Sequence, residues 1–298
     1  MKDLIIHGIL SDGMMRFCAI SGREIVQTAM RTHGLSRTGT AALGRQLLMT
    51  AMLSSQLKNS NDTVTTVLAG NGPGSNLVCV GRYGALVKGY ASHPAVELAP
   101  LPNGKLNVGG FVGHSGKLTV IKDMGLKDPY VGTCNLVSGE VAEDFAQYFT
   151  ISEQQPSLVY LGVRVKPENG DVISAGGFLL QTMPGCPEEV IDKAIALSPF
   201  VEDISLRLED GEQLEIILKT IFGRMDIVIN DIYHPSFSCD CSRERMETAL
   251  IAIGKEELSD ILEHDKKAEL VCHFCNKKYA FSEQDLTEVL REMTEINE

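Results

Sequence analysis

The chain has 298 residues, of which 44% are hydrophobic, and its formal net charge at pH 7 is −12. This apolar content is sufficient for a packed core and excludes wholesale disorder, and the length fits one large domain plus a small one, or two modest domains. The acidic balance argues against a nucleic-acid-binding protein, because such proteins need a basic surface that faces phosphate.

The start of the chain and its hydropathy predict a cytoplasmic protein. The first residues, Met1-Lys2-Asp3-Leu4, do not form a basic region followed by a long apolar run, so no secretory signal is visible. No segment has the roughly 18 continuous apolar residues that a membrane span needs, so no membrane partner is expected. In the reducing cytoplasm, paired cysteines more often bind a metal than form permanent disulfides.

The N-terminal part of the chain combines strand and helix patterns. Two apolar runs, over residues 4–9 and 14–20, flank a hairpin-like turn at Ser11-Asp12-Gly13. The periodicity then predicts helices over 24–33, 40–57 and 140–150. Short β-rich runs bounded by Gly, Pro and Asn predict strands over 63–69, 77–80, 85–90, 117–122, 131–137, 158–165 and 172–180. Because strands and helices do not alternate regularly, the expected fold class is α+β.

The character of the sequence changes after residue 184, and we expect an amphipathic helical linker over 185–238. Residues 188–197 have a helical pattern that stops before Pro199. A second helix is bounded by Gly211 and Gly223 and carries an apolar stripe at helical spacing, formed by Leu214, Ile217, Leu218 and Ile221. Such a stripe fits a permanently packed helix and a docked segment that can leave, and the pattern does not decide between the two.

Residues 239–298 are predicted to form a separate small domain, after a core domain over 1–184 and the linker. Ser242 precedes an apolar helix that Gly254 ends. Ser282 and Asp285 approximate a capping box before a second helix. A unit of this size rarely builds enough core to be stable alone, so it needs a staple such as a bound metal.

Four cysteines of this domain can provide the ligands of such a metal. The sequence Cys239-Asp240-Cys241 is followed, after thirty residues, by Cys272-His273-Phe274-Cys275. Two close cysteine pairs on a segment that folds back give the four corners of a tetrahedral zinc site. An all-sulfur ligand set leaves no open coordination position, so the expected zinc is structural. The C-x-C half is unusual, since two C-x-x-C pairs are the commoner pattern.

The spacing leaves open whether this site is a plain zinc knot or a redox switch, and it favours the former, because inert zinc sites are common. Thiolates are the form that oxidants attack, and their oxidation would release the ion. Nearby cations are expected to stabilise the negative ligand set; these are Arg243, Arg245, Lys266, Lys267, Lys277 and Lys278. His234, His264 and His273 flank the site, but four sulfurs already complete it.

The other cysteines are single and expected to be small buried hydrophobes: Cys18, Cys79, Cys134 and Cys186, the last lying in the linker.

Several motif-like stretches fail on inspection, and no catalytic constellation is found. The run Gly70-Asn71-Gly72-Pro73-Gly74 has its third glycine one residue early for a dinucleotide fingerprint, and Pro73 removes an N–H that a phosphate cradle would use. The sequence also lacks a P-loop, HExxH and GxSxG. We therefore expect a protein that is not an enzyme.

Taken together, these segments resemble one family along essentially the whole chain, the redox-regulated 33-kilodalton heat-shock chaperones (Hsp33-like). The resemblance is carried by the two cysteine segments, Cys239-Asp240-Cys241-Ser242-Arg243-Glu244-Arg245 and Cys272-His273-Phe274-Cys275, and by three further segments, Asn71-Gly72-Pro73, Ser152-Glu153-Gln154-Gln155-Pro156 and Ala175-Gly176-Gly177-Phe178-Leu179-Leu180-Gln181-Thr182-Met183-Pro184.

The resemblance implies an ATP-independent holdase that is inactive while reduced and zinc-bound. Oxidants, usually with heat, would form Cys239–Cys241 and Cys272–Cys275 disulfides, release zinc and unfold the zinc domain and linker. The active form would tend to dimerise and would bind unfolding client proteins. We hypothesise that the apolar linker residues contact clients: Leu214, Ile217, Leu218, Ile221 and Phe222. The competing interpretations are a zinc-ribbon adaptor that binds a fixed partner in either redox state, and a thiol oxidoreductase that uses Cys272 and Cys275.

Overall fold

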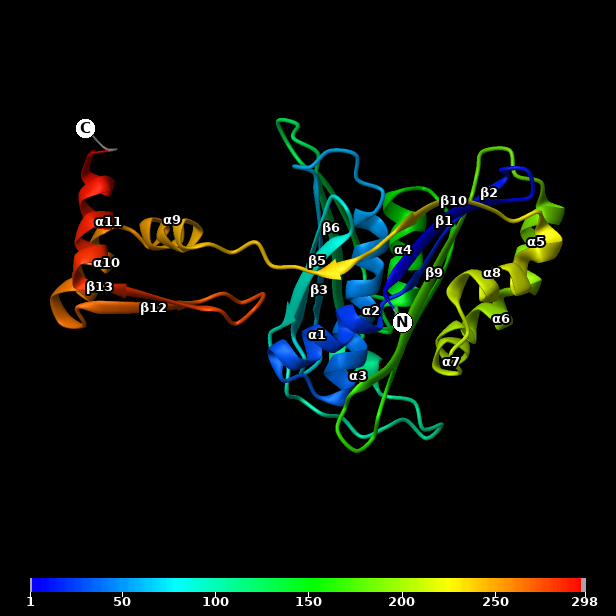
Figure 1. The fold of residues 1–298 in the computed structure, drawn as a ribbon, viewed down its shortest axis with the longest axis horizontal. Coiled ribbons are helices and arrows are strands. Elements are labelled where there is room, and N and C mark those ends of the chain that lie inside the picture. Colours follow the sequence, from blue (N-terminus) through cyan, green and yellow to red (C-terminus); the bar gives the residue numbers. More distant parts are fainter. Residues whose placement is uncertain (1, 296–298) are drawn as a thin grey trace. The chain divides into compact units, whose positions relative to one another are not determined.

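The structure, a computed structural model, describes residues 2–295 and divides the chain into two compact units, residues 1–238 and 239–298 (Figure 1). The larger unit contains two sheets with helices, and the smaller unit contains a two-stranded sheet with helices. The predicted α+β fold class is confirmed. Among residues 2–295, no helix combines the length and the apolar character that a bilayer span requires.

The first sheet of the larger unit has five antiparallel strands in the order β10-β1-β2-β9-β8. The turn predicted at Ser11, Asp12 and Gly13 joins β1 to β2, and all three residues have positive φ values of 49°, 53° and 84°. The strands are β1 (Leu4–Leu10), β2 (Met15–Ser21), β8 (Ser157–Val165), β9 (Val172–Thr182) and β10 (Val228–Tyr233).

The second sheet has six strands in the order β11-β5-β4-β3-β6-β7, antiparallel except for the short parallel pair of β11 and β5. The predicted runs of β-branched residues form its central strands, and the Gly- and Asn-containing segments between them are turns. The strands are β3 (Thr63–Gly70), β4 (Asn76–Arg82), β5 (Leu86–Ala91), β6 (Gly116–Asp123), β7 (Tyr130–Asn135) and β11 (Ser236–Phe237).

The core of the larger unit is organised around α2 (Arg37–Ser54), whose residues are buried almost throughout. This helix packs against strands of both sheets, which explains why its sequence is apolar or small on every side (Figure 1). The other helices of this core are α1 (Arg23–His33), α3 (Val108–Val112) and α4 (Ala142–Ser152).

Four short helices cover the opposite face of the first sheet. They are α5 (Glu188–Ala196), α6 (Ser198–Glu202), α7 (Ile204–Glu209) and α8 (Leu214–Phe222), followed by a 3-10 turn, η1 (Gly223–Met225). The Phe222 ring stacks on Phe178 of β9 with 5.1 Å between ring centroids, and Phe178 lies 6.0 Å from Phe17 of β2. The apolar stripe of α8 is therefore packed against the sheet.

The expectation that 185–238 is helical throughout is wrong for its last part. Residues 228–233 form β10 at the edge of the first sheet, and Ser236 and Phe237 form β11 in the second sheet. Main-chain hydrogen bonds to these sheets outweigh the weak local pattern of the segment. The linker sequence thus belongs to the larger unit and is joined to both of its sheets.

The smaller unit consists of three helices and a hairpin: α9 (Arg243–Ile253), α10 (Lys255–His264), β12 (Lys267–Val271), β13 (Lys278–Ser282) and α11 (Glu283–Glu295). Its caps are those expected from sequence. The Ser242 hydroxyl accepts a hydrogen bond from Arg245 N, and Gly254 ends α9 with a φ of 98°. Asp285 N donates to Ser282 Oγ while Asp285 Oδ2 accepts from Ser282 N, which completes the capping box.

Candidate metal centre

Two segments of the smaller unit bring the four cysteines together. Cys239 and Cys241 lie on the extended stretch before α9, and Cys272 and Cys275 lie in the turn between β12 and β13. Backbone hydrogen bonds hold that turn: Cys272 N donates to Lys277 O over 3.0 Å, and Asn276 N donates to Cys272 O over 2.8 Å. The left-handed φ of Asn276, 57°, folds the chain back within four residues.

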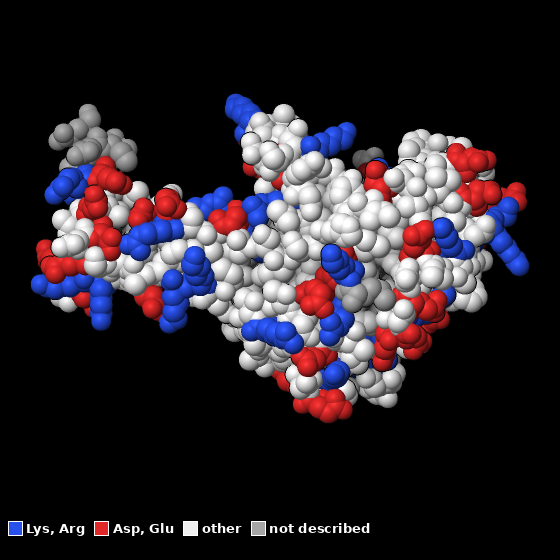
Figure 2. Space-filling model, viewed as in Figure 1, with Lys and Arg blue, Asp and Glu red and all other residues white. Residues whose placement is uncertain are grey.

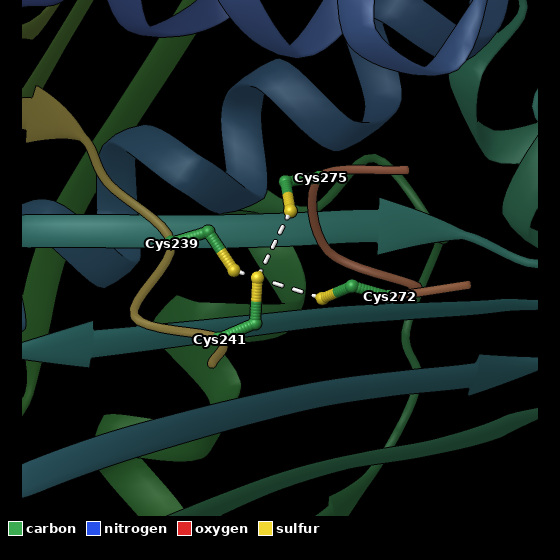
Figure 3. Close-up of side chains that lie close together, drawn as sticks. All are labelled: Cys239, Cys241, Cys272 and Cys275. Carbon is green, nitrogen blue, oxygen red and sulfur yellow. Dashed lines mark hydrogen bonds between the residues drawn. The ribbon is translucent and has the colours of Figure 1, made fainter. Parts of the chain in front are cut away.

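The four sulfurs point toward one another and lie within 4.8 Å of one another (Figure 3). The Sγ atoms of Cys239 and Cys272 are 3.7 Å apart, and those of Cys241 and Cys275 are 3.4 Å apart. Four sulfurs placed at metal–sulfur distances of about 2.3 Å in a tetrahedron are separated by about 3.8 Å. The donor set and its geometry therefore fit a metal ion with four thiolate ligands.

The hydroxyl of Tyr279, on β13, donates a hydrogen bond to Cys241 Sγ over 3.1 Å. Burial disfavours the Cys241 thiolate, but this bond and those of the neighbouring thiols outweigh burial and lower the pKa of Cys241 to about 7. Burial raises the pKa of Cys239 and of Cys275. Tyr279 was not anticipated from the sequence, although its position four residues after Cys275 on an alternating strand is a usable signal.

The cations expected around the sulfurs are mostly engaged elsewhere. Arg243 stacks on the Phe281 ring and pairs with Asp285 over 2.9 Å. Arg245 pairs with Asp240, Lys266 with Glu283, and Lys278 with Glu269. Acidic and basic side chains are interspersed over the face shown in Figure 2. Arg245 pairs with a residue that lies between two of the cysteines, and Lys277 lies over the ring of Tyr279. The role of the cations at the sulfurs stays a prediction.

The flanking histidines are not part of the ligand group. The cluster found among the described residues consists of the four cysteines. His264 is exposed on α10 and contacts Asp260, and His234 lies in the larger unit with its Nδ1 3.5 Å from Asp3 O. The placement predicted for them outside the ligand set agrees with this geometry.

The single cysteines behave differently from the four. Cys18, Cys79 and Cys134 are buried, as predicted, and burial raises the pKa of each thiol, to about 11 for Cys134. Cys186 is half-buried in the turn after β9. Neutral, shielded thiols are poor nucleophiles and poor ligands, so Cys18, Cys79 and Cys134 pack as small apolar side chains.

The whole chain is similar to known proteins. The family model described as Hsp33 protein matches residues 3–282. The chain belongs to the Hsp33 family. The 33 kDa chaperonin of Clostridioides difficile (strain 630) is 43% identical over 293 residues, which cover 98% of this chain and 100% of that protein. The 33 kDa chaperonin of Alkaliphilus oremlandii (strain OhILAs) is 42% identical over 297 residues, covering 100% of this chain and 99% of the relative.

A solved structure has the same fold. It is the crystal structure of the 33 kDa chaperonin (Heat shock protein 33 homolog) from Thermotoga maritima, with a TM-score of 0.87, 34% sequence identity, and coverage of 99% of this chain and 100% of that chain. The two chains therefore match over almost their whole length. The family resemblance noted from the cysteine segments is confirmed, and the protein is a chaperone by family.

Replacing Tyr279 with Phe is expected to weaken metal binding about tenfold, because outer hydrogen bonds to ligands typically contribute 10- to 100-fold in affinity. The measurement is a titration with Co²⁺, whose thiolate absorption reports the ligand set directly. The matched control is Tyr130→Phe, which removes a hydroxyl that donates to Ser152 O over 3.0 Å in the larger unit. Equal affinities of Tyr279→Phe and the control would show that this hydroxyl does not support the site.

Proposed function

We propose that this protein is a redox-regulated, ATP-independent holdase whose four cysteines bind zinc in the reduced, inactive state. The observation that carries the proposal is the convergence of Cys239, Cys241, Cys272 and Cys275 within 4.8 Å in a unit with little other core. Thiolates are ligands that suit Zn²⁺, and a complete four-sulfur set makes the ion structural. A reducing compartment such as the cytoplasm keeps these thiols available for metal.

Zinc binding accounts for most of the stability of the smaller unit. Among its described residues, eight buried ones form the centre of the core: Leu250, Leu258, Cys272, Tyr279, Phe281, Leu286, Val289 and Met293. The other three ligand cysteines pack against this cluster, so the metal centre is part of the core. A structural zinc site contributes roughly 10–16 kcal/mol in small peptides, whereas a whole domain is stable by about 5–15 kcal/mol. Loss of the ion is therefore expected to unfold the unit.

The pairing of the disulfides decides whether oxidation unfolds this unit. In the folded state every pair of sulfurs is within 4.8 Å, and the contacts of 3.7 Å for Cys239–Cys272 and 3.4 Å for Cys241–Cys275 join the two segments, so proximity does not select the local pairing. A Cys239–Cys272 or Cys241–Cys275 bond would join the two segments and replace the ion as a clamp. A Cys239–Cys241 bond and a Cys272–Cys275 bond each close a small local ring and leave the segments unconnected. A switch that unfolds on oxidation needs the local pairing.

The redox step is balanced with peroxide as oxidant. In each local pair, two thiolates give up two electrons and form one S–S bond, and the peroxide O–O bond breaks to give two water molecules with the uptake of two protons. The disulfide sulfurs carry no negative charge, so the ligand set is lost and zinc is released.

We propose that the four linker helices are released after the smaller unit unfolds. They are short, with 9 residues in α5, 5 in α6 and 6 in α7, and isolated helices of this length are not stable in water. Few residues of α5 to α7 are buried: Ala194 in α5, Val201 in α6, and Ile204 and Ser205 in α7. Low burial is the mark of a segment that opens before the rest of a domain.

Release of α8 creates the client surface. All five of its proposed client-binding residues are buried in the reduced structure: Leu214, Ile217, Leu218, Ile221 and Phe222. Their departure also uncovers the apolar sheet face that includes Phe17 and Phe178. Exposed apolar surface of this kind binds unfolding proteins and favours a dimer of the oxidised protein. The function is holding clients, and no catalytic step is assigned.

The proposal is tested by light scattering of a thermally unfolding client with reduced protein, and with protein treated with peroxide at elevated temperature. Oxidised protein is expected to release about one zinc per chain, lose helicity and suppress aggregation, and dithiothreitol with zinc is expected to reverse these effects. A zinc-ribbon adaptor would gain no suppression after oxidation. Catalytic turnover of an external disulfide would instead indicate an oxidoreductase.

Peptide mapping of the oxidised protein by mass spectrometry is expected to find Cys239 linked to Cys241 and Cys272 linked to Cys275. The proposed switch requires this pairing, because only the local bonds leave the two ligand segments free to separate. Reduced protein alkylated in denaturant serves as the reference for unlinked peptides. A dominant Cys239–Cys272 or Cys241–Cys275 linkage in active protein would contradict the proposed switch.

Replacing both Leu218 and Phe222 with Ser is expected to reduce the suppression by oxidised protein several-fold, because two of the largest apolar groups of α8 are lost. Ile216→Ser is the matched control, since Ile216 lies on the same helix but is 53% exposed in the reduced structure. The comparison uses oxidised proteins at equal concentration in the scattering assay. Unchanged suppression by the double variant would place the client surface outside α8.

A further inference from the structure

Strand β10 is attached to its sheet mainly through its backbone. It pairs with β1 alone, in the register Ile5–Tyr233, Ile6–Ile232, His7–Asp231, Gly8–Ile229 and Ile9–Val228. None of its six residues is buried: four are exposed, and Ile229 and Tyr233 are half-buried. An edge strand with so little side-chain burial is held chiefly by main-chain hydrogen bonds, which any extended chain can provide.

The β1–β10 pairing is also irregular. The register shifts between His7 and Gly8, so Asn230 is an extra residue on β10. At Gly8 the Val228 carbonyl oxygen comes within 2.2 Å of the position that a Cβ would occupy, so the close approach of β10 requires a glycine there. A bulge leaves part of the ladder unpaired and makes a strand easier to detach.

Strand β1, in contrast, is firmly built into the larger unit. It pairs with β2 along its whole length, from Leu4–Ser21 to Leu10–Met15. Ile5, Ile6 and Leu10 are fully buried. The departure of β10 would therefore leave β1 in place as a rigid edge with a row of unpaired N–H and C=O groups.

Both sides of this edge offer room for alternating side chains. On one face, Ile6 and Leu10 belong to the apolar cluster that α8 covers. On the other face, a cavity of about 600 Å³ lies beside β1. His7, Ile9, Ser55 and Tyr83 line its fixed part, and Asp231 and Tyr233 of β10 form the wall that a client strand would replace. The first face suits apolar side chains, and the second suits polar and aromatic ones.

We propose that, in the oxidised protein, the β1 edge vacated by β10 binds an extended segment of the unfolding client as an added β-strand. The inference rests on the proposed function, which releases residues 185–238, and it adds the mode of client recognition. Backbone hydrogen bonds give affinity without sequence specificity, and apolar residues at alternate positions enter the face uncovered by α8. In the reduced protein β10 occupies the client's place.

Of the other outer strands, β11 belongs to the same linker but covers only Leu86 and Val87 of β5, whereas β7 and β8 are not covered by a linker strand. β7 and β8 end their sheets in the structure of the larger unit, and no described strand pairs with their outer edges. An edge that is available before oxidation cannot account for activity gained by oxidation. The β1 edge combines a removable strand with an apolar face that is covered by a segment of the same linker.

A synthetic peptide of residues 226–236, which contains β10, provides the first test. Added to oxidised full-length protein, it is expected to reduce client suppression several-fold and to slow hydrogen exchange of β1 amides, while a scrambled peptide of the same composition does neither. Undiminished suppression with saturating peptide, in a protein that does hold clients, would overturn the inference alone. Failure of the oxidised protein to hold clients without peptide would instead refute the proposed function.

A cross-strand disulfide provides the second test. Ile9→Cys with Val228→Cys locks β10 on β1 at paired positions and leaves α5 to α8 free to separate. The matched control is Thr119→Cys with Thr133→Cys, a paired position on β6 and β7 where the hydroxyls are 3.3 Å apart. After oxidation both variants are expected to release zinc, but the β1–β10 variant is expected to lose suppression several-fold. Equal suppression by the two variants would overturn the inference.

Discussion

Ligation of one metal ion by four thiolates is the constraint on which the account of this protein depends. Among the described residues of the smaller unit, eight buried residues form the core, and one of them, Cys272, is a proposed metal ligand. The helices and the hairpin of this unit are individually short, and the turn that carries Cys272 and Cys275 is held by a few backbone hydrogen bonds. In the proposed function the bonds to the metal contribute more to the stability of this unit than side-chain burial does, so chemistry at sulfur would control whether the unit is folded.

The extent of side-chain burial differs between the parts of the larger unit, and this difference suits regulation by the smaller unit. Its centre, α2 between two sheets, is almost fully buried, whereas α5 to α7 bury one or two residues each and β10 buries none. Within residues 185–238, α5 to α7 and β10 bury few side chains, whereas α8 packs five buried residues against the sheet. In the proposed switch this segment leaves without unfolding the core, and its departure would expose the stacked rings of Phe17 and Phe178 together with the edge of β1.

Much of this arrangement can be predicted from the sequence, for reasons that are local. The spacing of the four cysteines predicts their convergence, because two close pairs need only a chain that folds back. The stripe from Leu214 to Ile221 predicts a buried helix face, and Ser242, Gly254, Ser282 and Asp285 predict helix ends in the smaller unit. These signals depend on neighbours within a turn or two of the chain.

The features that escaped prediction depend on distant partners. Strand β10 has few buried side chains and becomes a strand because β1, more than two hundred residues earlier, offers an edge. Tyr279 is a strand residue whose hydroxyl lies 3.1 Å from Cys241 Sγ only because the fold brings two distant segments together. The cations near the cysteines are close in sequence, but ion pairs with carboxylates engage four of them.

The central claim is tested most directly by hydrogen exchange of the full-length reduced protein before and after removal of zinc with a chelator. The account predicts that amides of β12 and β13 lose their protection while amides of α2 keep theirs. Retained protection of β12 and β13 in the metal-free protein would contradict it.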